Sequence, residues 1–184
     1  MESNKILFVD LDGTLIKEDL SDLAFSYSLK HYPLKTLFYL FIFLFKGKPY
    51  LKEKISKNFD VPFDSLTFNK AALDFIREVK NRHRVVYLIS GSHQVLVDQM
   101  DKFLNIFFES FGTRDNFNMV GSNKVQFIKE NLKIHDFDYL GNSYKDLPIW
   151  KYTKHAIHTN ASPRLIMSIK SLDFEDKEIP ANFN

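Results

Sequence analysis

The sequence predicts an α/β fold in which a parallel β-sheet lies between two layers of helices. Short apolar segments, too short to be helices, alternate with segments whose apolar residues recur at helical spacing. The chain has 184 residues, of which 45% are hydrophobic, and this suits one domain with a small insert. Because strands that alternate with helices form parallel sheets, we expect helices on both faces of the sheet.

Five segments are predicted to be strands. The first, 5–10, is apolar and ends in an acid, and the second, 84–90, is apolar and rich in β-branched residues. The others are 106–112, 137–141 and 155–159. Between the strands, apolar stripes at helical spacing predict helices over 68–79 and 96–104. The tail 173–184 is polar, and we expect it to be loose.

Residues 17–66 interrupt this alternation, because they show no strand pattern. We interpret them as a helical insert in a core made of 1–16 and 67–184. The insert contains the apolar run Thr36–Phe45, which is about half of the roughly 20 residues that a membrane-spanning helix requires. We expect this run to form a helix. Three environments could bury its apolar side chains: the protein's own core, an interface with a partner chain, or an anionic membrane surface, which the lysines that flank the run would favour.

The most informative stretch of the chain is Ile6–Leu15, where a buried strand ends in Asp10 and Asp12 and is followed by Gly13. Glycine permits the sharp turn that must follow. Open α/β sheets place their sites at the carboxyl ends of such strands. Two adjacent carboxylates repel each other, so a cation is expected between them, and Mg²⁺ is the ordinary choice. One acid can attack phosphorus while the other transfers protons, although two solvated acids at a strand end would give the same pattern.

The string from Asp10 to Leu15 resembles the first motif of the haloacid dehalogenase (HAD) superfamily of phosphohydrolases. The resemblance implies a HAD-like Rossmannoid three-layer sandwich with a parallel sheet and a small helical cap inserted after the first strand. It also implies that Asp10 is the nucleophile and Asp12 the general acid and base. Thr14 would help to hold the turn and the phosphate.

Three later positions match the remaining motifs of that family. Ser90 and Gly91 end the second predicted strand just before a helix, and would bind the phosphate. Lys124 would neutralise the nucleophile and the transferring phosphoryl group. The Mg²⁺ ligands would be Asp10, Asp12 through its backbone carbonyl, and Asn142, with Asp146 supporting them. The family usually has an acid at the position of Asn142, so this departure weakens the expected metal site.

Longer strings narrow the resemblance to one branch. The segments 139–150 and 156–165 resemble the HAD domain that is associated with UbiA-type prenyltransferases. This implies a lipid-linked or sugar phosphate as substrate, and a membrane surface or a prenyltransferase as a partner.

The function that follows is a Mg²⁺-dependent phosphatase that cleaves a phosphomonoester through an aspartyl-phosphate. The alternative is a HAD-like binding or regulatory module with little turnover, because Asn142 weakens its metal site. The net charge of +2 gives no electrostatic case for nucleic acid. The absence of cysteine and of a signal peptide leads us to expect a cytoplasmic protein that is soluble or peripheral to a membrane. The oligomeric state is not predicted.

Overall fold

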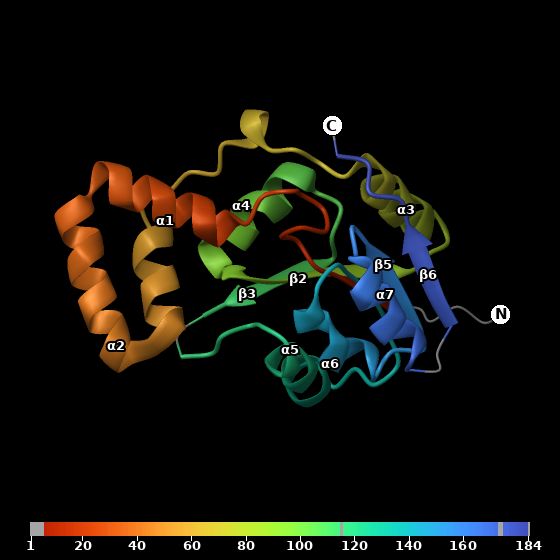
Figure 1. Cartoon of the computed structure of the whole chain (residues 1–184). Coiled ribbons are helices and arrows are strands. Elements are labelled where there is room, and N and C mark those ends of the chain that lie inside the picture. The colour runs from red at the N-terminus through yellow and green to blue at the C-terminus, as the bar shows by residue number, and fades with distance from the viewer. Residues whose placement is uncertain (1–5, 115, 173–174, 184) are drawn as a thin grey trace.

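In the computed structural model, which describes residues 6–114, 116–172 and 175–183, six strands form one parallel sheet (Figure 1). Their order across the sheet is β3-β2-β1-β4-β5-β6, and every neighbouring pair is parallel. The strands are β1 (Ile6–Val9), β2 (Val85–His93), β3 (Glu109–Thr113), β4 (Asp138–Gly141), β5 (His155–Thr159) and β6 (Glu175–Ile179).

Helices cover both faces of this sheet, with α3 and α4 on one face and α5, α6 and α7 on the other (Figure 1). Two further helices, α1 and α2, extend beyond the carboxyl ends of β2 and β3. The bounds are α1 (Leu20–His31), α2 (Pro33–Ser56), α3 (Lys70–Asn81), α4 (Gln94–Leu104), α5 (Ser122–Gln126), α6 (Leu147–Trp150) and α7 (Pro163–Lys170). Shorter turns are the 3₁₀ segments Phe63–Ser65 and Tyr144–Asp146 and the π-helical turn Phe127–Asn131.

Alternate residues of the strands point into two separate cores, as a sheet covered on both faces requires. Leu7 and Val9 of β1 are fully buried in the core beneath α3 and α4. Phe8, between them, is buried in the opposite core with Trp150, the largest fully buried side chain of the described residues. The prediction of a three-layer α/β fold with a parallel sheet is confirmed.

The strand order fixes where a site can form. The chain leaves β1 for β2 and β3 on one side, then crosses back to β4 on the other side of β1. The adjacent carboxyl ends of β1 and β4 therefore lie where the direction of winding reverses, which is where open α/β sheets bind ligands. Asp10 follows β1 at this point, and its backbone N–H donates to Leu140 O of β4.

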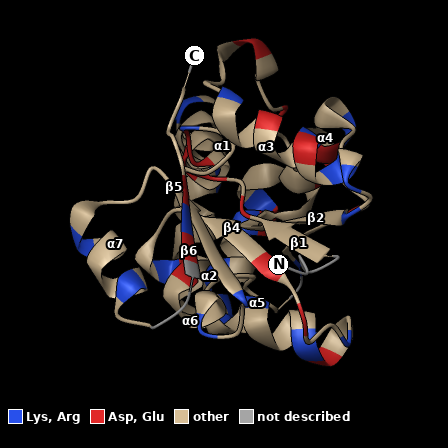
Figure 2. Ribbon diagram, turned by 90° about the vertical axis from the view of Figure 1, so that its right-hand side faces the viewer, with Lys and Arg blue, Asp and Glu red and all other residues tan. Residues whose placement is uncertain are grey.

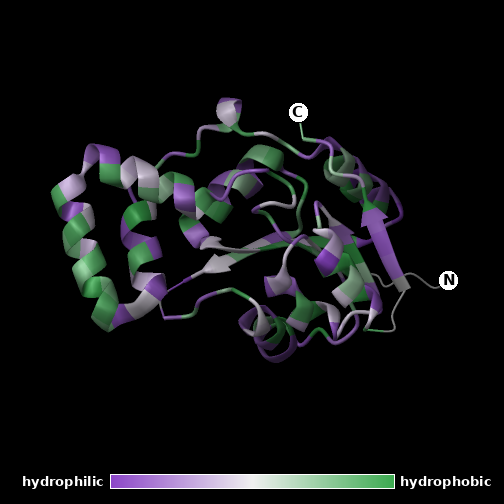
Figure 3. Cartoon of the chain, in the orientation of Figure 1, coloured by the Kyte–Doolittle hydropathy of each residue, from purple (hydrophilic) through white to green (hydrophobic). Residues whose placement is uncertain are grey.

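Two sequence-based expectations were wrong. The polar tail is not loose, because 175–179 forms β6 and pairs with β5 along its whole length; residues 173, 174 and 184 lie outside the described residues, as does Lys5 of the first predicted strand. The strand is polar except for the buried Ile179 at its end (Figure 3), and a polar strand is permissible at a sheet edge. In addition, β2 runs to His93, three residues past its predicted end at Ser90, with a register shift after Ile89, so Gly91 lies within the strand.

The predicted helix over Thr36–Phe45 is part of α2, which packs against α1. α2 is bent at Gly47, whose φ of 76° and ψ of −177° are not helical, and Pro49 follows. We call Pro33–Lys46 the outer limb and residues 48–56 the inner limb. In the described part of the chain, no helix is long and apolar enough to cross a membrane. The boundaries of the cap, 17 and 66, remain an interpretation of the sequence.

A buried asparagine ties the turn after β1 to three other parts of the fold. Asn69 is fully buried, and its Nδ2 donates to Thr14 O (3.1 Å) and to Thr159 Oγ1 at the end of β5 (3.0 Å). Its Oδ1 accepts from Ala72 N, as the N-cap of α3, and from Asn182 N of the tail. All the hydrogen-bonding capacity of this amide is therefore used.

We expect Asn69→Ala to lower the free energy of unfolding by about 2–4 kcal/mol, because it removes an N-cap and leaves several buried groups without partners. Chemical denaturation of the two proteins measures the difference. Asn131→Ala, at an exposed position, is the matched control and should change stability by less than about 0.5 kcal/mol. Equal effects of the two substitutions would show that the network does not stabilise the fold.

Candidate functional site

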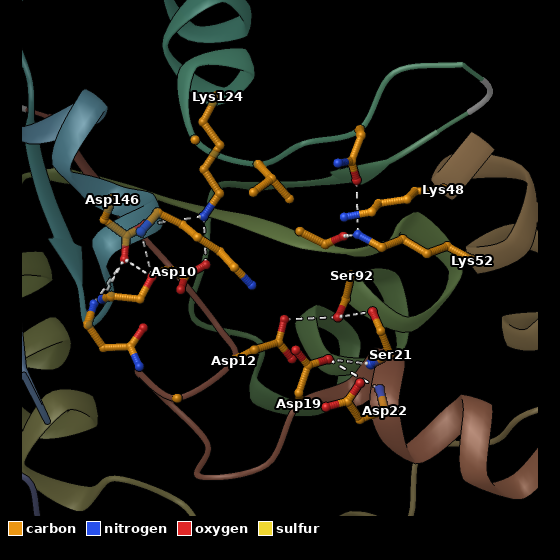
Figure 4. Close-up of a pocket in the computed structure, with 18 of the residues that line it drawn as sticks. Asp10, Asp12, Asp19, Ser21, Asp22, Lys48, Lys52, Ser92, Lys124 and Asp146 are labelled. Atoms are coloured by element: carbon orange, nitrogen blue, oxygen red, sulfur yellow. Dashed lines mark hydrogen bonds and ion pairs between the residues drawn. The ribbon is translucent and has the colours of Figure 1, made fainter.

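A cavity of about 470 Å³ opens at the carboxyl ends of β1, β2 and β4, between the sheet and α1 and α2 (Figure 4). It collects residues that are far apart in sequence. Those from the sheet domain include Asp10, Asp12, Gly13, Gly91, Ser92, Asn118, Lys124, Asn142, Ser143 and Asp146, and those from the insert include Lys17, Asp19, Ser21, Asp22, Lys48 and Lys52.

The centre of the site is an ion pair between Asp10 and Lys124. Lys124 Nζ lies 2.6 Å from Asp10 Oδ1, and both side chains are almost fully buried. Thr14 is fully buried, and its hydroxyl lies 3.4 Å from Asp10 Oδ2. The lysine thus holds one carboxylate oxygen, and the other points toward Thr14.

Behind this pair lies a chain of buried polar groups that runs through Tyr139. Lys124 Nζ donates to Tyr139 OH (2.8 Å), and this hydroxyl donates to Asp146 Oδ1 (2.7 Å). Asp146 Oδ2 accepts from the backbone N–H groups of Asn142 (3.1 Å) and Ser143 (3.0 Å). These contacts fix Asp146 behind Lys124. Burial and the neighbouring Asp146 and Asp10 raise the pKa of Tyr139 well above its usual value, so the phenol stays protonated and can keep donating.

Asp12 occupies a different environment, formed jointly by β2 and the insert. Its Oδ2 accepts from the hydroxyls of Ser90 (2.8 Å) and Ser92 (2.9 Å), and its Oδ1 accepts from Leu20 N at the start of α1 (2.9 Å). Ser92 in turn shares a hydrogen bond of 3.1 Å with Ser21 of α1. Ser90 is fully buried and its hydroxyl is directed at Asp12; it does not line the cavity, whereas Gly91 does.

Burial dominates the electrostatics of both acids. It raises the pKa of Asp10 to about 7, an effect that Lys124 opposes and that Asp146 and Asp12 reinforce. Burial, with the charge of Asp19, also raises the pKa of Asp12, although three donated hydrogen bonds oppose this. A carboxyl group whose pKa is raised keeps its proton to a higher pH than usual, which suits a role in proton transfer.

The turn after β1 brings Asn142 against Gly13. Gly13 has a φ of 75°, and a Cβ atom built there would lie 2.2 Å from Asn142 Nδ2, so only glycine fits. Within the described ranges, no three His, Cys, Asp or Glu side chains gather to hold a metal. Mg²⁺, however, typically takes one or two carboxylates and completes its shell with water and substrate phosphate. The carboxylate of Asp10, the carbonyl of Asp12 and the amide of Asn142 fit that requirement. The buried acids Asp10 and Asp146 share one lysine, and Asp12 adds a third carboxyl group, so a cation would have negative charge to offset.

Two residues of the site were not identified as such from the sequence. Tyr139, buried behind the cavity, stood out only as part of a motif string, and Lys52 was interpreted as one of the lysines that would favour a membrane surface. Lys52 Nζ reaches across from the inner limb of α2 to Gly91 O (2.6 Å) and Asn118 Oδ1 (3.0 Å). Its burial lowers its pKa, an effect that Asp19 and Asp12 oppose. Only the folded position of α2 identifies Lys48 and Lys52 as residues of the site (Figure 4).

A comparison with curated proteins finds a relative in Sinorhizobium fredii, an uncharacterized protein named y4nM. It is 32% identical over 151 residues, which are 82% of this chain and 29% of the relative. The chain therefore spans less than a third of the length of this relative. No family model matches the chain.

Solved structures of similar shape include phosphatases. A substrate-bound phosphoserine phosphatase has a TM-score of 0.60 and 18% identity, with 96% of this chain and 93% of that chain covered. A HAD family hydrolase from Salmonella enterica serovar Typhi has a TM-score of 0.61 and 17% identity, with 95% and 67% covered. At these identities the likeness establishes the architecture alone: the chain has the α/β fold of the HAD-superfamily hydrolases.

Proposed function

We propose that the chain is a Mg²⁺-dependent phosphatase of the HAD type, which cleaves a phosphomonoester through an aspartyl-phosphate on Asp10. The observation that supports this most strongly is the pair formed by Asp10 and Lys124, 2.6 Å apart, at the carboxyl end of the central strand and at the wall of an open cavity. A buried acid paired with one lysine and adjacent to a second acid has the charge arrangement that phosphoryl transfer requires.

In the first step, a carboxylate oxygen of Asp10 attacks phosphorus and the bond from phosphorus to the ester oxygen breaks. Asp12, whose pKa is raised by burial, gives its proton to the departing alkoxide. In the second step, Asp12 takes a proton from water, the water oxygen attacks phosphorus, and inorganic phosphate leaves as Asp10 is regenerated.

Lys124 would offset the charge on the phosphoryl oxygens throughout, since it already faces Asp10. Ser90, Gly91 and Thr14 remain predicted phosphate ligands. For Ser90 this role requires its hydroxyl to turn away from Asp12, to which it donates in the structure. Mg²⁺, held by Asp10, the carbonyl of Asp12 and Asn142, would neutralise charge on the phosphate.

The substrate class follows from the narrower resemblance to the domain associated with UbiA-type prenyltransferases, which suggests a lipid-linked or sugar phosphate. Five lysines line the cavity and would pair with an anionic ligand: Lys17, Lys48, Lys52, Lys124 and Lys145. Five aspartates line it too, so a cation bound beside them would strengthen the binding of an anion. Asp19 and Asp22 at its rim would repel a second anionic group beside them. A prenyltransferase as a partner is part of the same proposal.

Asp10→Asn should reduce hydrolysis of a generic aryl phosphate to below roughly 1% of the wild-type rate, because an amide cannot form the acyl phosphate. The assay is run with and without Mg²⁺. Asp64→Asn, which makes the same chemical change at an exposed position, is the control and should retain full activity. Substantial activity in the Asp10 variant would show that another group is the nucleophile. A wild-type protein that hydrolyses none of a panel of phosphomonoesters would favour the binding module.

The same variant should also show how burial of Asp10 affects stability. The folded protein holds a proton on Asp10 up to about pH 7, whereas the unfolded chain releases it near the ordinary pKa of 3.8. Between these values the folded state binds the extra proton, so its stability falls as pH rises. In a chelating buffer, Asp10→Asn should therefore gain thermal stability relative to the wild type as pH rises through this window. Parallel melting curves for the two proteins would contradict the raised pKa.

Asn142→Asp should tighten Mg²⁺ binding by roughly tenfold, because it adds an anionic oxygen ligand without adding bulk over Gly13. Isothermal titration calorimetry measures the affinity, and Asn131→Asp, at an exposed position, controls for the added charge. If Asn142→Asp left the affinity unchanged or weakened it, Asn142 would be removed from the proposed metal ligands.

A further inference from the structure

The outer limb of α2 presents its apolar face to solvent. Its large apolar residues recur three or four positions apart and are between 57% and 83% exposed: Leu34, Leu37, Phe38, Phe41, Leu44 and Phe45. We call these six residues the apolar stripe. A surface helix normally turns such a stripe toward the core. The stripe lies on the part of the molecule farthest from β6, where the green ribbon marks apolar residues (Figure 3).

A polar contact joins the inward face of the same limb to α1. Thr36 is fully buried, and its hydroxyl lies 2.7 Å from the hydroxyl of Ser28 on α1. Thr36 Oγ1 also donates to Tyr32 O (2.9 Å). A pair of hydroxyl groups therefore joins the two helices. Leu40 and Phe43, on the same face as Thr36, are half-buried, whereas the six residues of the stripe point outward.

The charge around the stripe has one sign. Between Asp22 and Glu53 the sequence contains five lysines and no acid, although the whole chain carries only +2. Lys48 and Lys52 line the cavity, and the other three, Lys30, Lys35 and Lys46, are exposed. Lys35 and Lys46 flank the stripe, and each lies over a tyrosine ring, Tyr32 at 5.5 Å and Tyr50 at 5.2 Å. On the face near β6, by contrast, acidic and basic residues are interspersed (Figure 2). Lysine and tyrosine beside apolar groups are the side chains that favour the headgroup region of a bilayer.

We propose that the apolar stripe with its flanking lysines is a docking surface for an anionic lipid bilayer, with the outer limb lying in the plane of the membrane surface. The limb from Pro33 to Lys46 is shorter than the roughly 20 residues that a span needs, so it rests in the interface and does not cross. A second copy of the chain is a poorer occupant, because the same concentration of lysine on both partners would repel.

Docking would place the bilayer beside the site. The stripe and the cavity share one helix, because the inner limb of α2 carries Lys48 and Lys52, which line the cavity. Lys52 links this limb to β2 through Gly91 O. If the proposed phosphatase activity is correct, the phosphate of a membrane-borne substrate would be presented next to this opening. The docking surface itself does not rest on that activity.

Co-sedimentation of the full chain with vesicles tests the proposal. We expect the wild-type protein to pellet with vesicles of equal parts phosphatidylglycerol and phosphatidylcholine at low salt. It should bind much less to phosphatidylcholine alone, or to the mixed vesicles at high salt. Phe41→Ser with Phe45→Ser should lower the partition coefficient by roughly tenfold or more. Lys35→Glu with Lys46→Glu should abolish the preference for the anionic lipid.

Matched control variants change equally exposed residues elsewhere. Phe108→Ser with Met167→Ser removes apolar groups that are 71% and 64% exposed, and Lys151→Glu with Lys154→Glu reverses two exposed charges near the amino-terminal edge of the sheet. Both should bind vesicles as the wild type does. Because all substituted side chains are exposed, circular dichroism should show folded proteins throughout.

Three results would overturn the proposal: a wild-type protein that stays in the supernatant with anionic vesicles at low salt, stripe variants that bind as well as the wild type, or a dimer in solution that the stripe variants dissociate. Hydrolysis of a soluble aryl phosphate is measured in parallel. A wild-type protein that binds the vesicles but does not hydrolyse this ester would contradict the proposed phosphatase activity and support the docking surface.

Discussion

The burial of two acidic side chains beside one lysine at the end of β1 is the constraint on which the site depends. Asp10 and Asp146 are nearly inaccessible to water, and Lys124 is the cation that faces both, 2.6 Å from the first and 3.9 Å from the second. A buried charge is tolerated only when it is paired and hydrogen-bonded. The Tyr139 hydroxyl and the turn at Asn142–Ser143 supply those bonds, so β4 is as necessary to the site as β1.

The sheet order explains why these residues meet. Parallel strands bring all their carboxyl ends to one edge, and the reversal of winding between β1 and β4 leaves room there for a ligand. The acids Asp10, Asp12 and Asp146 lie together because they follow the adjacent strands β1 and β4. The helices α1 and α2 contribute further polar groups from the other side of the cavity. Asn69 then fixes the turn that follows Asp12, because its amide binds the carbonyl of Thr14.

The sequence predicted the parallel sheet and the neighbourhood of Asp10 because both depend on local patterns. A short apolar run followed by acids and glycine has few other structures available. It could not predict β6, whose residues Glu175–Ile179 alternate no apolar face and pair only because the edge of β5 is free to receive them. Nor could it predict that Tyr139 and Lys52 belong to the site, because Lys124, Gly91 and Asn118, which they contact, are distant in sequence. Ser90 shows a third case: the residue was found, but the strand continues through it and directs its hydroxyl to Asp12.

The helices of the insert have two physical roles: they complete the site, and they carry the exposed apolar stripe. Leu20 N and Ser21 of α1 reach Asp12 and Ser92, and Lys52 of α2 reaches Gly91, so these helices complete the environment of the second acid. Displacing α1 would remove one of the three donors to Asp12 and admit water to a carboxyl group whose raised pKa depends first on burial. At the far side of the same helices, the exposed apolar stripe leaves α2 incompletely covered. Because both limbs belong to one helix, a partner that binds the outer limb would also affect the position of the inner limb. Lys52 would pass that change to the site through its contact with Gly91.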